Sequence, residues 1–133
     1  MTEATGRNLT GTWNGLYSYQ RGMEPVGFVA DLVDVSSWLG GGVRETAPGR
    51  DGRLATFHAE VSGRRSGGQV VFVKTYDGTG GRIHSVDYDG TLSQDGTEIE
   101  GTWRIARQAA GRFLMIRPEG RALAVARETF ARV

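Results

Sequence analysis

Cysteine is absent from this chain of 133 residues, so disulfides and thiolate chemistry are excluded. Lysine is almost absent, because Lys74 is the only lysine among the 16 basic residues, a bias that is typical of a GC-rich bacterial genome. No apolar run reaches the length of a transmembrane helix, and the amino terminus has no apolar core of a secretory signal. We therefore expect a cytoplasmic protein without a membrane partner, unless a leader was removed.

Charge of one sign is also lacking. The net charge is +1, and basic and acidic residues are interspersed along the chain, so nothing indicates a nucleic-acid partner. The sequence contains no phosphate-binding Gly-x-x-x-x-Gly-Lys loop, no Gly-x-Ser-x-Gly elbow and no zinc-ligand spacing. It therefore predicts no cofactor, no metal site and no assignable catalytic residue, and it favours a binding protein over an enzyme.

Glycine, in contrast, is abundant, with 21 copies that have no collagen period. Asp-Gly and Gly-Gly dipeptides, which favour tight hairpins, separate runs of alternating apolar and polar residues. The runs cover residues 9–19, 26–33, 42–46, 54–61, 70–77, 83–92, 97–106 and 112–117. Because no helical run separates them, we predict an all-β fold, an eight-stranded antiparallel up-and-down (meander) β-barrel, with a two-sheet sandwich as the alternative.

The chain is short enough for one domain, and we expect residues 1–133 to form a single barrel domain. In this prediction residues 1–8 are an amino-terminal arm, 9–117 the barrel and 118–133 a carboxy-terminal tail. Apolar residues at helical spacing in the tail, such as Ala122, Ala126 and Phe130, favour a short amphipathic helix. A final strand is the alternative.

Two copies of one triplet, Gly11-Thr12-Trp13 and Gly101-Thr102-Trp103, lie in the first and the seventh of the predicted strands. With Tyr88-Asp89-Gly90 and the ending Glu128-Thr129-Phe130, they resemble the calycin group of barrels, which includes lipocalins, fatty-acid-binding proteins and avidins. The layout is most similar to the avidin family. The lipocalin-like resemblance implies that Trp13 packs at the closed end of the barrel beneath Arg117, as a cation–π pair.

The biotin-site residues of the avidin family are missing from this chain. Val73 stands where a pocket tryptophan would precede the lysine, and His84 and Val86 stand where hydroxyl side chains would lie. The resemblance therefore implies a ligand other than biotin.

Lys74 shares a strand face with Phe72 and Tyr76. If this face points inward, the buried ammonium needs a partner, which can be Glu45, Glu100 or an anionic ligand, because an unpaired buried charge is costly. If it points outward, Lys74 pairs at the surface. Trp38 is expected in a flexible Gly-rich connection between two strands, where it acts either as a lid over the barrel opening or as an anchor in a subunit interface.

The predicted interior consists mostly of aromatic side chains and carries a few polar groups, a composition that suits a ligand pocket. We therefore predict a small-molecule-binding barrel for a small hydrophobic or aromatic ligand with a polar head, and we expect it to form a homo-oligomer (dimer or tetramer). The predicted pocket residues are Tyr17, Tyr19, Phe28, Glu45, Phe72, Lys74, Tyr76, His84, Tyr88 and Trp103. A register error of one residue would exchange the two faces of a strand.

Two other functions remain open. One is a barrel enzyme, an isomerase or cyclase that acts on a hydrophobic metabolite, with His84, Tyr88, Glu45 or Lys74 as acid or base. The other is a structural or interaction domain whose interior is filled by its own side chains.

Overall fold

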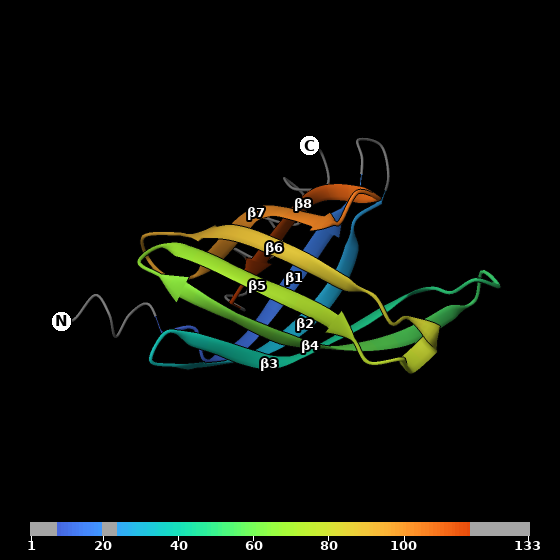
Figure 1. The fold of residues 1–133 in the computed structure, drawn as a ribbon, viewed down its shortest axis with the longest axis horizontal. Helices are drawn as coiled ribbons and strands as arrows, with labels where there is room; N and C mark the ends of the chain where they lie inside the picture. Colours follow the sequence, from blue (N-terminus) through green and yellow to red (C-terminus); the bar gives the residue numbers. More distant parts are fainter. Residues whose placement is uncertain (1–7, 20–23, 118–133) are drawn as a thin grey trace.

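Eight antiparallel strands follow one another around a closed barrel in the computed structural model, which describes residues 8–19 and 24–117 (Figure 1). The strands are β1 (Gly11–Ser18), β2 (Val26–Val35), β3 (Trp38–Pro48), β4 (Leu54–Ser66), β5 (Gln69–Tyr76), β6 (Ser85–Leu92), β7 (Glu98–Ile105) and β8 (Ala109–Ile116), with one 3₁₀ turn, η1 (Thr79–Gly81). The barrel closes where β8 pairs with β1. The predicted all-β, eight-stranded meander is confirmed, and the closed barrel is consistent with a calycin-like fold.

Alternation along each strand places one set of side chains in the interior. In β5 the inward set is Val70, Phe72, Lys74 and Tyr76, and the residues between them face the outside. The turns have the predicted chemistry, since Gly67 and Gly96 adopt positive φ in tight connections. No helix in the described part of the chain has the length and apolar character needed to cross a membrane.

The two ends of the barrel differ. At one end, which we call the closed end, Trp13 is fully buried and its indole N–H donates to the carbonyl of Leu9 over 2.9 Å. The Arg117 guanidinium lies 4.6 Å from the centre of the Trp13 ring and donates to the carbonyl of Asn8. The predicted cation–π pair of Trp13 and Arg117 is confirmed. At the other end, the open end, lie the long β3–β4 hairpin and η1 (Figure 1).

An ion pair also lies at the closed end. The Asp34 carboxylate accepts from Arg65 over 2.6 Å and from the backbone N–H of Leu9 over 2.9 Å. Arg65 belongs to β4, which runs five residues beyond the predicted run of 54–61 and up to the Gly67-Gly68 turn. Its side chain therefore joins two strands at the barrel end.

The prediction that Trp38 lies in a flexible connection is wrong, because β3 begins at Trp38 and runs straight through three glycines. A Cβ on Gly41 would collide with the Asp31 backbone, so the glycine here allows β2 and β3 to approach closely. Trp38 lies near the closed end on the outer face, and it therefore does not cover the open end. The predictions for the tail, 118–133, and for residues 1–7 of the arm concern residues outside the described ranges.

Candidate functional site

A buried carboxylate with four hydrogen-bond donors lies inside the barrel near its open end. Glu45 Oε1 accepts from Tyr76 over 2.9 Å and from the ammonium of Lys74 over 3.3 Å. Its Oε2 accepts from Arg82 over 2.7 Å and from the hydroxyl of Tyr17 over 2.8 Å. The Glu45 side chain is completely shielded from solvent, so this network satisfies a charge that would otherwise be costly to bury.

Strand alternation explains how these groups meet. Tyr17 comes from β1, Glu45 from β3, and Lys74 and Tyr76 from β5, and all four occupy inward positions of their strands. Arg82 follows η1 and reaches the same carboxylate from the barrel rim. Three other parts of the chain therefore converge on the carboxylate from β3, and we call these five side chains the Glu45 cluster.

Four aromatic rings surround the Lys74 ammonium. Its nitrogen lies 4.8 Å from the ring centres of Tyr17 and Tyr76, 5.3 Å from that of Tyr88 and 5.5 Å from that of Phe28. The side chain is nearly fully buried, so the inward alternative for Lys74 is confirmed and Glu45 is its partner. Glu100, the other carboxylate considered, is exposed on the outer face. Cation–π contacts of this kind are strongest where water is excluded.

Burial sets the protonation of the cluster. It lowers the pKa of Lys74 to about 8, although the charge of Glu45 opposes the shift. Burial alone would raise the pKa of Glu45, but the Lys74 charge, the hydrogen bonds from Tyr17 and Tyr76 and the Arg82 charge together lower it. Burial and the Glu45 charge raise the pKa values of Tyr17 and Tyr76, which remain neutral phenols and donors.

At neutral pH the Glu45 cluster holds an excess of positive charge, because Lys74 and Arg82 oppose one carboxylate. The nearby His84 responds to this excess. Its pKa is lowered by partial burial and then by the charges of Arg82 and Lys74. A neutral imidazole therefore lies beside a site with one unbalanced cation.

The structure brings the ten predicted pocket residues to the interior and to the rim at the open end. Eight are buried, whereas Tyr19 and His84 lie at the rim. The Tyr19 ring packs edge-on against Trp103, with 5.0 Å between ring centres, and the His84 ring lies 4.8 Å from that of Tyr76. Phe72 packs against Tyr88 in a parallel stack with 4.7 Å between ring centres. Whether these residues bind a ligand remains a prediction.

The cavity next to Lys74 is small. It has a volume of about 10 Å³, close to what a single water molecule requires. It is lined by Tyr17, Tyr19, Lys74, Tyr76, His84, Val86, Tyr88, Trp103 and Ile105. A ligand larger than water needs a rearrangement of the rim.

Arg82 is a site residue that the sequence did not predict. Arg82 falls between the predicted strand runs 70–77 and 83–92, in the connection that contains Gly78–Gly81. In the structure Gly80 has a φ of 71° and lies so close to Phe57 that a Cβ would be 2.6 Å from its ring. The Arg82 guanidinium lies 3.8 Å from the centre of the same ring. The only feature of the sequence that could have indicated Arg82 is its position as a basic residue directly after a Gly-rich turn.

No protein-family model matches this sequence, and no curated protein is similar enough to count as a relative. The resemblance to the avidin and lipocalin families therefore stays a prediction. Within residues 8–19 and 24–117, no group of three His, Asp or Glu side chains is placed to hold a metal ion. The function has to be inferred from the geometry of the Glu45 cluster.

A pH dependence follows from Lys74. Between its folded pKa of about 8 and the ordinary 10.5, the unfolded chain binds a proton that the folded chain does not. Stability therefore rises with pH in this window. We expect the wild type to gain about 2 kcal/mol relative to Lys74→Met between pH 8 and pH 10. Denaturant unfolding of both proteins measures the difference.

The comparison with Lys74→Met also removes the contribution of the buried tyrosines. Above pH 10 they act in the opposite direction, because the unfolded chain ionises its tyrosines while the folded chain keeps Tyr17, Tyr76 and Tyr88 protonated. The tyrosines are common to both proteins, so their effect cancels. A difference in stability that stays constant from pH 8 to pH 10 would contradict the depressed pKa of Lys74.

Proposed function

We propose that the protein binds a small hydrophobic or aromatic molecule with an anionic head, such as a carboxylate, at the open end of the barrel. The observation that carries the proposal is the buried Glu45 cluster, in which two cations and neutral phenols surround a single carboxylate. A purely structural ion pair would balance its charges. The excess cation inside an aromatic enclosure favours an anion as the partner.

The surroundings of the cluster suit the rest of such a ligand. Tyr19, Trp103 and Ile105 supply apolar surface beside the small cavity, and His84 supplies a polar edge. Mostly apolar walls with a few placed polar groups are typical of small-molecule sites. The anionic head of the ligand would accept hydrogen bonds from Lys74, Arg82 or a tyrosine hydroxyl. The apolar body of the ligand would take the place of the Tyr19 and His84 rings at the rim.

Access requires Tyr19 and His84 to move. Both lie at the rim, and 37% of the Tyr19 surface is exposed. The Tyr19 ring packs against the buried rings of Trp103 and Tyr17, and the His84 ring packs against that of Tyr76. Aromatic pairs contribute about 0.5–1.5 kcal/mol each, a cost that a ligand can offset by burying its own apolar surface.

A self-packed barrel is the second candidate, because the cavity beside Lys74 has room for only one water. In that case the Glu45 cluster specifies the fold, and the protein acts as a structural or interaction domain. The barrel enzyme that the sequence leaves open has no specific support in the described residues.

Matched ligand pairs test the proposal. We expect 2-naphthoate to bind more tightly than 2-naphthylmethanol, and decanoate more tightly than decanol, in calorimetric titrations at pH 7. Arg82→Gln should weaken carboxylate binding about tenfold or more, because hydrogen bonds to charged groups contribute about 1.5–3 kcal/mol. Binding of the anion should also raise the pKa of His84, which NMR follows directly.

Arg44→Gln is the control for this test, because Arg44 is an exposed residue on the outer face of the same strand as Glu45. It should leave carboxylate affinity unchanged. Equal affinity for acid and alcohol would contradict the anionic head. A barrel that binds none of the four compounds would support the self-packed alternative.

A further inference from the structure

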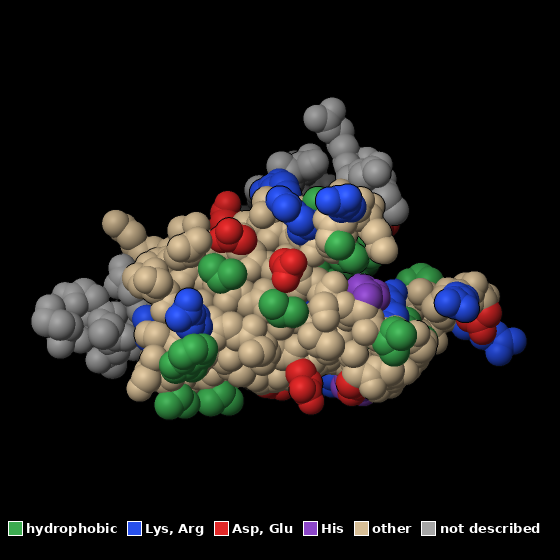
Figure 2. Space-filling model, in the orientation of Figure 1, with side chains coloured by type: hydrophobic (Ala, Val, Ile, Leu, Met, Phe, Trp, Pro, Cys, Tyr) green, Lys and Arg blue, Asp and Glu red, His purple; other side chains and the backbone are tan. Residues whose placement is uncertain are grey.

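Exposed large hydrophobic side chains are concentrated on one part of the outer surface. Eight such side chains occur among the described residues, and five of them lie on the outer face of β2, β3 and β5: Val33, Val35, Trp38, Val71 and Val73. Figure 2 shows hydrophobic side chains on one face of the barrel, with basic and acidic side chains among them. Such a concentration is typical of an interaction surface rather than of scattered surface residues.

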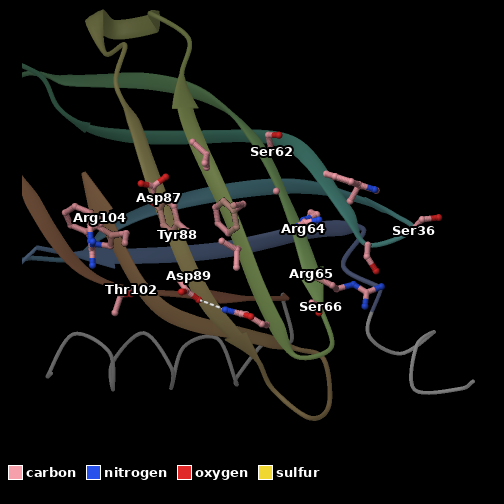
Figure 3. Close-up of a pocket in the computed structure, with 18 residues that line it drawn as sticks. Ser36, Ser62, Arg64, Arg65, Ser66, Asp87, Tyr88, Asp89, Thr102 and Arg104 are labelled. Atoms are coloured by element: carbon pink, nitrogen blue, oxygen red, sulfur yellow. Dashed lines mark hydrogen bonds between the residues drawn. The ribbon is translucent and has the colours of Figure 1, made fainter. Parts of the chain in front are cut away.

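Strand register arranges this surface in two neighbouring rows. The first row crosses the strands as Val35, Trp38, Arg64, Val71, Asp89 and Thr102. The second crosses them as Val33, Gly40, Ser62, Val73, Asp87 and Arg104. We call these two rows the outer-wall patch. A hollow of about 940 Å³ lies over much of it, and Figure 3 shows Arg64, Asp87, Asp89 and Arg104 around it.

The basic side chain Arg64 and the two acidic side chains next to β5 lie on opposite sides of this strand. Val71 and Val73 occupy the centre, with 44% of the Val71 surface exposed. Arg64 lies on the β4 side, and Asp87 and Asp89 lie on the β6 side. Arg64 and Asp89 are two strands apart and form no ion pair with each other in the structure: Arg64 lies over the Trp38 ring, and Asp89 accepts from Gln69.

We propose that the outer-wall patch is the interface of a symmetric dimer of this chain. A twofold axis between two facing patches, parallel to β5, places the β4–β6 part of each row against the same part of that row in the second copy. Val71 then faces Val71 of the second copy, and Arg64 faces Asp89 of the second copy. The patch is therefore complementary to itself: its apolar centre faces the same apolar centre, and its basic side faces the acidic side of the second copy. An isologous interface requires this self-complementarity.

The same features select against other partners. The patch carries two acidic side chains, Asp87 and Asp89, against two basic ones, Arg64 and Arg104, so it has no excess of positive charge to attract nucleic acid or anionic lipid. Trp38, with 63% of its surface exposed and Arg64 5.2 Å from its ring centre, supplies the aromatic and arginine side chains that are enriched in protein interfaces. The open end lies outside this surface, so the dimer is independent of ligand binding.

Sedimentation velocity of the full chain tests the dimer. We expect the wild type to sediment as a dimer and Val71→Lys to sediment as a folded monomer, because the substitution places two ammonium groups face to face on the axis. Thr75→Lys is the matched control, since Thr75 lies on the same face of β5 outside both rows. It should leave the dimer intact.

A charge exchange tests the register. Arg64→Glu and Asp89→Arg should each weaken the dimer about tenfold or more, because each places like charges together twice in the interface. The double variant Arg64→Glu/Asp89→Arg should restore it, since the reversed charges again face each other. Circular dichroism confirms folding of every variant. A monomeric wild type, a Val71→Lys dimer of wild-type affinity, or a double variant weaker than both single variants would each overturn the proposal.

Discussion

Replacing Glu45 by alanine is expected to lower the free energy of unfolding by about 3–5 kcal/mol. The substitution removes the acceptor of four donors and leaves the Lys74 ammonium buried without a carboxylate. An uncompensated buried charge is among the most destabilising changes that a single substitution can make. Denaturant unfolding at pH 7 measures the loss.

The two members of the Glu45–Lys74 pair should not be equivalent. Lys74→Met should cost less than Glu45→Ala, because Glu45 keeps Arg82, Tyr17 and Tyr76 when the ammonium is removed. The double variant Glu45→Leu/Lys74→Met should recover at least half of the loss, since it buries neither charge. A Lys74→Met variant less stable than Glu45→Ala would contradict the central role of the carboxylate.

Gly101→Ala is expected to cost about 3 kcal/mol or more, or to prevent folding. Gly101 pairs with Gly90 where β6 and β7 come close together. A Cβ on Gly101 would lie 2.6 Å from the Gly90 Cα and closer still to the Asp89 carbonyl oxygen. Both obstacles are backbone atoms, so no side-chain rearrangement relieves the clash. Thermal and denaturant unfolding of the variant check this.

Gly42→Ala is the control for Gly101→Ala. Gly42 is also a strand glycine, but the nearest atom to its added Cβ is 3.8 Å away. We expect its stability to change by less than about 1 kcal/mol, since only the difference in strand propensity remains. Similar losses for the two variants would show that the close approach at Gly101 is not what requires glycine.

Most of the fold could be predicted from the sequence because its turns and its alternation are local signals. Asp95-Gly96 and Gly67-Gly68 end strands where their dipeptides predict it. Gly40–Gly42 carries the same composition but lies inside β3, since there glycine permits close strand packing rather than a turn. Composition does not distinguish the two uses.

Only part of the candidate site could be predicted from the sequence. Alternation placed Lys74, Phe72 and Tyr76 on one face but did not say which face points inward, because a period of two is symmetric. Arg82 could not be found, since it lies against Phe57 and Glu45 through contacts between segments that are distant in the sequence. How completely side chains fill the interior depends on the barrel diameter, which no local pattern encodes.

The closure of the barrel has a kinetic consequence. Seven of the eight strand pairs join neighbours in the chain, whereas the β1–β8 ladder joins residues about a hundred positions apart, such as Asn14 and Ile116. The hydrogen bond from the Trp103 indole to the Ser18 carbonyl spans 85 positions. The entropy cost of long-range loop closure is therefore concentrated in one seam, and the rate of folding should depend on how readily that seam forms.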